Sequence, residues 1–174
     1  MRARLSVDAA VLVPVYRDRA GDMHVVLVVR TEHGRHGGQI AFPGGIHSPA
    51  DADLRETALR EAHEEIGLER GSVEVVATLP QVDTTTGYVV TPFLARLVTE
   101  PPAWQRQERE IAEVLSVALT DLAREDLRGE EMWDLPRGRW LVRFVRLGRH
   151  TLWGATYRIL EPLIPRLLAG EWAI

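Results

Sequence analysis

The segment from Phe42 to Leu68, FPGGIHSPADADLRETALREAHEEIGL, joins a glycine turn to a stretch with helical character. Gly44 and Gly45 allow backbone conformations and close approaches that a side chain would block. Gly67 is a typical helix end, so the pattern predicts a helix from about Ala52 to Gly67. The signals for its start are a capping oxygen and a proline: Ser48, Pro49 and Asp51. The residues predicted to pack on a core are Ala58, Leu59, Ala62 and Ile66.

Three acidic residues of this helix, Glu61, Glu64 and Glu65, are spaced i, i+3 and i+4. At about 100° per residue they share one face of the helix, within an arc of roughly 100°. Their repulsion costs up to about 0.5 kcal/mol per pair in a bare helix, so a cation is expected among them. Carboxylate oxygens suit Mg²⁺ or Mn²⁺. A solvated acidic face bridged by Arg60 is the alternative interpretation, and these residues alone leave both open.

Residues 60–68, REAHEEIGL, resemble the ending of the Nudix box, R-E-hydrophobic-x-E-E-x-G-hydrophobic, at every specified position. The front half of the box departs from the usual pattern. Gly45 and Asp51 stand one residue earlier than the usual glycine and glutamate. That offset is similar to the coenzyme A pyrophosphatase branch of the Nudix hydrolases.

The polar loop from residue 30 to 39, RTEHGRHGGQ, precedes the glycine turn. It is interpreted either as a flexible connector or as a loop that grips phosphate. Residues 27–45 are similar to the signature upstream of the box in coenzyme A pyrophosphatases, which is associated with coenzyme A recognition. Gly34 departs from this signature, since the branch usually has leucine there. Further along the chain, Ser48 stands where the branch usually has aspartate. The resemblance implies substrate-binding roles for Arg30, Arg35 and Gln39.

The remaining pattern alternates strands with a terminal helix, which indicates an α/β fold. Strands are expected at 7–16, 24–29, 73–79, 88–98 and 114–119, with a strand or hairpin at 132–147. Helices are expected at 120–125 and 152–168, the second kinked or shortened by Pro162 and Pro165. Pro92 suggests that its strand lies at an edge or contains a bulge. The resemblance implies one Nudix hydrolase domain over residues 1–174, an α/β/α sandwich around a mixed β-sheet.

Composition excludes several classes of protein. The 174 residues include no cysteine, so a disulfide framework, a thiol nucleophile and a zinc-thiolate site are excluded. The net charge of -4 disfavours general nucleic-acid binding. No run of about 18 apolar residues is present, so we expect no membrane span. The apolar run near the N-terminus is short and lacks a cleavage-like end, so we expect no signal peptide and a cytoplasmic protein.

The resemblance implies metal-dependent hydrolysis of the pyrophosphate bond of coenzyme A or its derivatives, giving 4′-phosphopantetheine and adenosine 3′,5′-bisphosphate. Mg²⁺ or Mn²⁺ is the implied cofactor. Its implied ligands are Glu61, Glu64, Glu65 and the carbonyl of Gly45. Arg60 is expected to orient the glutamates. The general base is left open between Glu61, Glu64 and Glu110, and a solvated acidic patch is the alternative interpretation of the residues around Glu110.

Two other functions stay open at this stage. The first is a Nudix pyrophosphatase that acts on ADP-ribose, dinucleotides or nucleoside triphosphates. The second is a non-catalytic Nudix module that binds nucleotides, although all three glutamates of the box are retained. The phrases at residues 87–92 and 150–156 also resemble the coenzyme A branch, so they favour coenzyme A over both alternatives. Because many Nudix proteins form dimers, a homodimer is left open.

Overall fold

The computed structural model describes residues 6–32, 37–101 and 103–174. A mixed sheet of eight strands runs through the centre of the molecule, in the order β3-β2-β1-β7-β5. Beside this path, β4 pairs with β1, β6 with β7 and β8 with β2. The strands are β1 (Val7–Arg17), β2 (Met23–Arg30), β3 (Ile40–Ala41), β4 (Gly44–Ile46), β5 (Val73–Thr78), β6 (Val82–Asp83), β7 (Tyr88–Leu97) and β8 (Ile111–Ala118).

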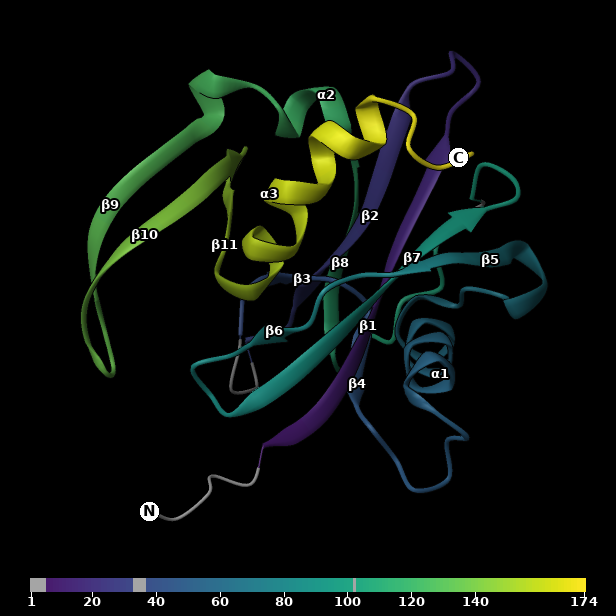
Figure 1. The fold of residues 1–174 in the computed structure, drawn as a ribbon, viewed down its shortest axis with the longest axis horizontal. Coiled ribbons are helices and arrows are strands. Elements are labelled where there is room, and N and C mark those ends of the chain that lie inside the picture. The colour runs from purple at the N-terminus through teal and green to yellow at the C-terminus, as the bar shows by residue number, and fades with distance from the viewer. Residues whose placement is uncertain (1–5, 33–36, 102) are drawn as a thin grey trace.

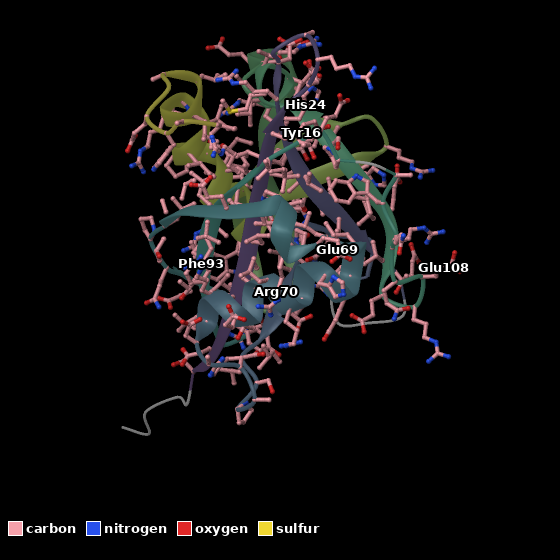
Figure 2. The ribbon with its side chains drawn as sticks, turned by 90° about the vertical axis from the view of Figure 1, so that its right-hand side faces the viewer. Tyr16, His24, Glu69, Arg70, Phe93 and Glu108 are labelled. Carbon is pink, nitrogen blue, oxygen red and sulfur yellow. The ribbon has the colours of Figure 1, made fainter. Side chains whose placement is uncertain are left out.

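A long parallel pairing of β1 with β7 makes the sheet mixed. The expected hairpin of β1 and β2 is present as an antiparallel pair. Tyr16 and His24, which are paired in this hairpin and labelled in Figure 2, stack with ring centroids 5.3 Å apart. Pro92 was expected at an edge or bulge, but β7 lies between β1 and β5, and the nearby register shift falls at Val75–Ala77 of β5. The edge part of that prediction is therefore wrong.

Two helices cover opposite faces of this sheet, with β1 and β7 between them in Figure 1. Alternation of buried residues along β1 sends Leu12 toward α1 (Leu54–Ile66) and Val13 toward α3 (Gly154–Leu168). Each face therefore has a core of its own, and the expected α/β/α sandwich around a mixed sheet is confirmed. Within the described ranges, every helix is too short or too polar to span a lipid bilayer.

The C-terminal part adds a three-stranded sheet in the order β11-β10-β9. Its hairpin arm stands at the left of Figure 1. Its elements are β9 (Arg128–Leu135), β10 (Gly138–Leu147) and β11 (His150–Trp153), preceded by α2 (Leu119–Leu122) and the 3₁₀ turn at Glu125–Leu127. A further 3₁₀ turn, Arg70–Ser72, follows α1. The prolines at 162 and 165 do not shorten α3, which continues to Leu168.

Candidate active site

The acidic helix α1 begins two residues later than predicted and is capped by a different residue. The backbone N–H of Glu56 donates to the side chain of Asp53 at 2.8 Å, so Asp53 is the N-cap. Gly67 ends the helix in the left-handed conformation with φ of 71°. The apolar face packs on the sheet as predicted, through Ala58, Ala62 and Ile66, which are almost fully buried. This packing fixes which way the glutamates of α1 point.

Glu65 is the most buried of the three glutamates, with a side chain that is 2 % exposed. Its Oε2 accepts a hydrogen bond from the backbone N–H of Gly44 at 3.1 Å. Its Oε1 lies 3.6 Å from Nη2 of Arg30. Burial raises the pKa of Glu65 to about 7, against the opposing effects of Arg30 and of the Gly44 N–H. A buried carboxylate with so little compensation is well suited to receive a cation.

The glycine turn lets β4 approach both the sheet and α1 closely. A Cβ on Gly44 would overlap the backbone of β1 at Ala10 and Val11, and a Cβ on Gly45 would overlap the carboxylate of Glu61. The two glycines therefore bring the β4 backbone against α1 and beside the ends of Glu61 and Glu65. The role of the turn predicted from sequence, close approach, is what this geometry requires.

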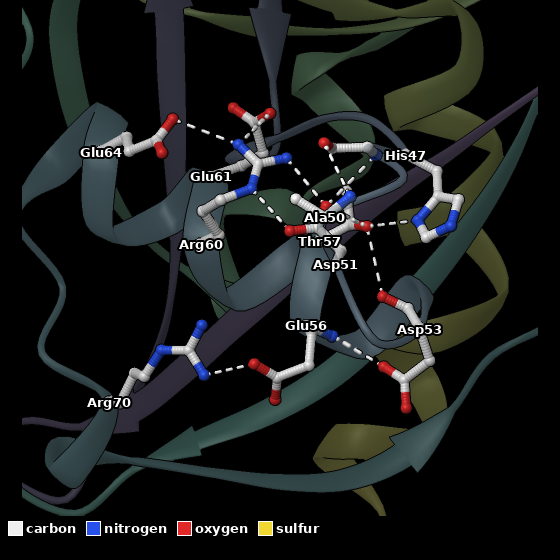
Figure 3. Close-up of polar contacts among 11 residues, drawn as sticks. His47, Ala50, Asp51, Asp53, Glu56, Thr57, Arg60, Glu61, Glu64 and Arg70 are labelled. Carbon is white, nitrogen blue, oxygen red and sulfur yellow. Dashed lines mark hydrogen bonds and ion pairs between the residues drawn. The ribbon is translucent and has the colours of Figure 1, made fainter.

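Arg60 contacts Glu61 and Glu64, the two more exposed glutamates of the site, as the close-up in Figure 3 shows. Its Nη1 donates to Oε1 of Glu61 at 2.9 Å and to Oε2 of Glu64 at 3.2 Å. Burial raises the pKa of Glu61, and the bond from Arg60 opposes that rise. Glu64 is more open, with 55 % of its side chain exposed. The expected contacts between Arg60 and these two glutamates are therefore present.

Asp51 is the partner of Arg60 that the sequence analysis did not assign. Nε of Arg60 donates to Oδ1 of Asp51 at 2.8 Å, and Nη2 donates to Oδ2 at 3.0 Å. This two-pronged bond holds the pKa of the Asp51 carboxyl well below its usual range. The available signal was the position of Asp51 in the box, one residue before the usual glutamate. It was interpreted there as a helix-start residue.

The predicted base candidate Glu110 lies in the turn before β8 and is exposed. Its backbone carbonyl accepts a hydrogen bond from the N–H of Thr31 at 2.8 Å. The charge of Glu110 is one of the causes that raise the pKa of both Glu61 and Glu65. The charge of Glu110 is thus near enough to act on these two helix carboxylates, although Glu110 comes from another part of the chain.

The three residues predicted to bind substrate have different positions. The side chain of Arg30 lies beside Glu65, and its Nη2 donates to the carbonyl of Gly44 at 3.3 Å. Gln39 lies next to it, because its carbonyl accepts from the N–H of Arg30 at 3.1 Å. Arg35 lies outside the described residues. The side chain of Arg30 is thus at the site, whereas Gln39 is connected to it through a backbone hydrogen bond to Arg30.

The residues present fit a divalent cation by their chemistry. Among the residues that the structure describes, no three carboxylate or imidazole side chains already form a closed metal-binding group. Arg60 instead bonds Glu61 and Glu64, and Arg30 approaches Glu65. However, Glu65 is buried, and among the described residues Arg30 is the one cationic side chain within 4 Å of it, at 3.6 Å. Because Gly45 has no side chain, its backbone lies close to Glu61. Such oxygen donors are the ligands that Mg²⁺ and Mn²⁺ prefer.

Comparison with known proteins decides the family. The sequence profile of the NUDIX domain matches residues 7–140. The chain belongs to the Nudix family. The Nudix match ends within β10, so the rest of that strand, β11 and α3 lie beyond it.

Two curated relatives of this Nudix chain are described as uncharacterized Nudix hydrolases named NudL. The protein from Enterobacter sp. (strain 638) is 41% identical over 132 residues, which are 71% of this chain and 67% of the relative. The protein from Salmonella paratyphi B (strain ATCC BAA-1250 / SPB7) is 37% identical over 161 residues, 90% of this chain and 80% of the relative. The second similarity therefore continues well past the Nudix match.

Solved structures support the same Nudix fold. RenU, a Nudix hydrolase from M. smegmatis, has a TM-score of 0.58 at 27% identity over 68% of this chain and 74% of its own. A MutT/nudix family protein from Enterococcus faecalis has a TM-score of 0.64 over 97% of this chain and 64% of its own. Its identity is 16%, so this likeness concerns the fold alone.

Proposed function

We propose that the chain hydrolyses the pyrophosphate bond of coenzyme A or one of its derivatives, to 4′-phosphopantetheine and adenosine 3′,5′-bisphosphate. Membership of the Nudix family supports hydrolysis of a phosphoanhydride in general. The observation that carries this chemistry is the meeting of Glu61 and Glu65 with the Gly44-Gly45 turn beside Arg30. The choice of coenzyme A rests on the resemblance at residues 27–45, 87–92 and 150–156.

Mg²⁺ or Mn²⁺ is the proposed cofactor, with Glu61, Glu64, Glu65 and the carbonyl of Gly45 as its ligands. A bound ion would neutralise negative charge on the anhydride oxygens, which otherwise repel a nucleophile. The chain itself must keep the carboxylates ionised and correctly turned. Arg60 favours the ionised form of Glu61 by hydrogen bonding to it, and it restrains Glu64 in the same way.

A carboxylate must also accept a proton from the attacking water. Glu61, Glu64 and Glu110 are the candidates. Glu64 and Glu110 are the exposed members of the set, so solvent water reaches them directly. Arg30, Gln39 and Arg35 are proposed to bind the phosphates of the substrate. Nη2 of Arg30 already lies 3.6 Å from Oε1 of Glu65. To bind a phosphate as well, the Arg30 side chain would have to be shared between Glu65 and the phosphate.

Replacement of Glu65 by Gln tests the proposed metal ligands. Gln keeps the shape and one acceptor for the Gly44 N–H, but it removes the charge. We expect hydrolysis of coenzyme A to fall by orders of magnitude, with the far-ultraviolet circular dichroism unchanged. The measurement is chromatography of the products with Mg²⁺ or Mn²⁺ present. Turnover within about threefold of wild type, a difference of less than about 0.7 kcal/mol in activation free energy, would show that the assignment is wrong.

A substrate panel separates coenzyme A from the alternatives. ADP-ribose, dinucleotides and nucleoside triphosphates are incubated in parallel with coenzyme A and the same metal ions. Cleavage of another anhydride with coenzyme A left intact would keep the catalytic site and reject the substrate. No cleavage of any compound would favour the non-catalytic binding module.

A further inference from the structure

We propose that Thr57 and His47 are positioning residues, which act through Asp51 to hold Arg60 in the orientation that restrains Glu61. This proposal rests on the proposed hydrolysis at the same site. Asp51 is the shared link, because it bonds both Thr57 and Arg60. Among the described residues, the side chains of Thr57 and His47 hydrogen-bond each other, Asp51 and the carbonyl of Asp53, and not the glutamates. Any effect on the glutamates therefore has to pass through Asp51 and Arg60.

A continuous line of short hydrogen bonds joins the four residues, as Figure 3 shows. Nδ1 of His47 lies 2.9 Å from Oγ1 of Thr57. The hydroxyl of Thr57 donates to Oδ2 of Asp51 at 2.8 Å. Asp51 then accepts two bonds from Arg60, at 2.8 and 3.0 Å. The line of hydrogen bonds therefore begins at His47, just after β4, passes through Thr57 in the first turn of α1, and ends at Arg60 in the middle of that helix.

The single hydroxyl proton of Thr57 sets the direction of this line. Its bond to Asp51 is 2.8 Å, shorter than its 3.2 Å approach to the carbonyl of Asp53. When the proton points to Asp51, the hydroxyl oxygen can only accept from His47. Nδ1 of His47 must then carry the hydrogen. A donor at that atom is what keeps the Thr57 hydroxyl turned toward Asp51.

The guanidinium of Arg60 divides its donors between two partners. Nε and Nη2 bind Asp51, whereas Nη1 binds Glu61 and Glu64. Because the group is planar and rigid, fixing the edge that faces Asp51 also fixes Nη1. Thr57 is fully buried and the Asp51 side chain is 6 % exposed, so water cannot readily replace the lost hydroxyl. Loss of that hydroxyl should therefore loosen Arg60 and Glu61.

The test compares Thr57→Val with Thr57→Ser in the whole chain. The first readout is solvent exchange of the Arg60 Nε hydrogen in metal-free protein, followed by nitrogen-15 NMR and assigned with Arg60→Lys. The second readout is steady-state hydrolysis. For Thr57→Val we expect exchange to be about tenfold faster and kcat about tenfold lower, because a hydrogen bond to a charged group is lost. KM should change less than kcat, because Thr57 does not contact the phosphates. Thr57→Ser should restore both values.

Thr156→Val is the matched control. Thr156 is also buried, at 8% exposure, and its hydroxyl donates to the carbonyl of Ile40 on the opposite face of the sheet. The Thr156→Val variant should lose about as much stability as Thr57→Val and leave hydrogen exchange at Arg60 unchanged. His47→Leu should weaken the line in the same direction as Thr57→Val. His47→Asn, which keeps a donor near the position of Nδ1, should not.

The outcomes separate this proposal from the proposed function. Unchanged exchange at Arg60 in Thr57→Val, with wild-type hydrolysis intact, would overturn the positioning role alone. Equally fast exchange of the Arg60 Nε hydrogen in Thr156→Val would also overturn it, because the effect would then come from a general loss of stability of the fold. Faster exchange in Thr57→Val alone, in a protein that cleaves no pyrophosphate, would keep the line of bonds and reject the function.

Discussion

At the scale of single residues, the site is built from carboxylates in unequal surroundings. Glu65 is 2 % exposed, Glu61 is 16 % exposed and Glu64 is 55 % exposed. The pKa of Glu65 is raised to about 7, chiefly by burial. The most buried group therefore pays the largest desolvation cost, and a cation would remove that cost. The charge of Glu65 that would bind the metal therefore lowers the stability of the metal-free protein.

The raised pKa of Glu65 makes a prediction about stability and pH. The folded protein holds the Glu65 proton more tightly than the unfolded chain, in which the carboxyl has its ordinary pKa of 4.5. The cost of ionising Glu65 is thus absent below about pH 4.5, grows as the pH rises and is complete above about pH 7. Metal-free Glu65→Gln should be more stable than wild type at pH 8, by up to about 3 kcal/mol. The difference should vanish near pH 4.

Urea denaturation at several pH values, with a chelator present, measures this difference. Added Mg²⁺ should stabilise the wild type at pH 8 and have less effect on Glu65→Gln, because it binds only the native state. Glu108→Gln is the control, since the Glu108 side chain is 80% exposed. A gap between Glu65→Gln and wild type that is the same at pH 4 and pH 8 would contradict the burial of an ionised group.

At the scale of elements, α1 carries most of the candidate site, and both its ends are defined by side-chain or backbone bonds. Asp53 caps the start, and Gly67 ends it by donating to the carbonyls of Ala62 and His63. An ion pair of Glu56 with Arg70 ties the first half of the helix to the 3₁₀ turn that follows it. These restraints hold the helix at a constant rotation against the sheet. The rotation in turn decides that Glu65 points inward and Glu64 outward.

Substitution of Gly67 by Ala should destabilise the protein. The φ of 71° at Gly67 is in the left-handed region, and a new Cβ would lie 2.9 Å from Cβ of Gln105. We expect a loss of about 1–2 kcal/mol in the free energy of unfolding, measured by urea denaturation. Gly71→Ala is the matched control, because a Cβ there meets nothing within 4 Å. Equal effects of the two substitutions would contradict the role of Gly67 as a helix end.

At the scale of the whole molecule, the central sheet needs a cover on both faces. α1 covers one face with small residues and Ile66, whereas α3 covers the other with larger side chains. The family match ends at residue 140, before α3, but the fully buried leucines of α3 belong to the same core as β1 and β2. The C-terminal segment is therefore part of the fold that supports the site.

Replacement of Leu160 by Ala tests this role of α3. Leu160 is 1% exposed within the core shared with β1 and β2. We expect a loss of about 2–5 kcal/mol, from lost burial and the cavity left behind. Leu168→Ala, in the same helix at 48% exposure, should change stability by no more than about 0.5 kcal/mol. Similar losses in both variants, measured by thermal or urea unfolding, would show that α3 is not part of the cooperative core.

The sequence was sufficient for features that depend on neighbours along the chain. The glycine turn, the extent of α1 to within two residues at its start, and the shared face of Glu61, Glu64 and Glu65 all follow from local spacing. So does the contact of Arg60 with Glu61 and Glu64, since residues up to four apart meet on a helix surface. The existence of most strands followed in the same way from apolar runs and turn residues.

Only the tertiary structure revealed the parallel pairing of β1 with β7, the burial of Glu65 and the partners of Arg30 and Asp51. These features join residues that are nine or more positions apart in the chain. Local periodicity contains no information on which distant segment will pack there. Asp51 is the clearest case. Its residue type suits both a helix start and a bond to arginine, and only the arrangement of the loop against α1 chooses between them.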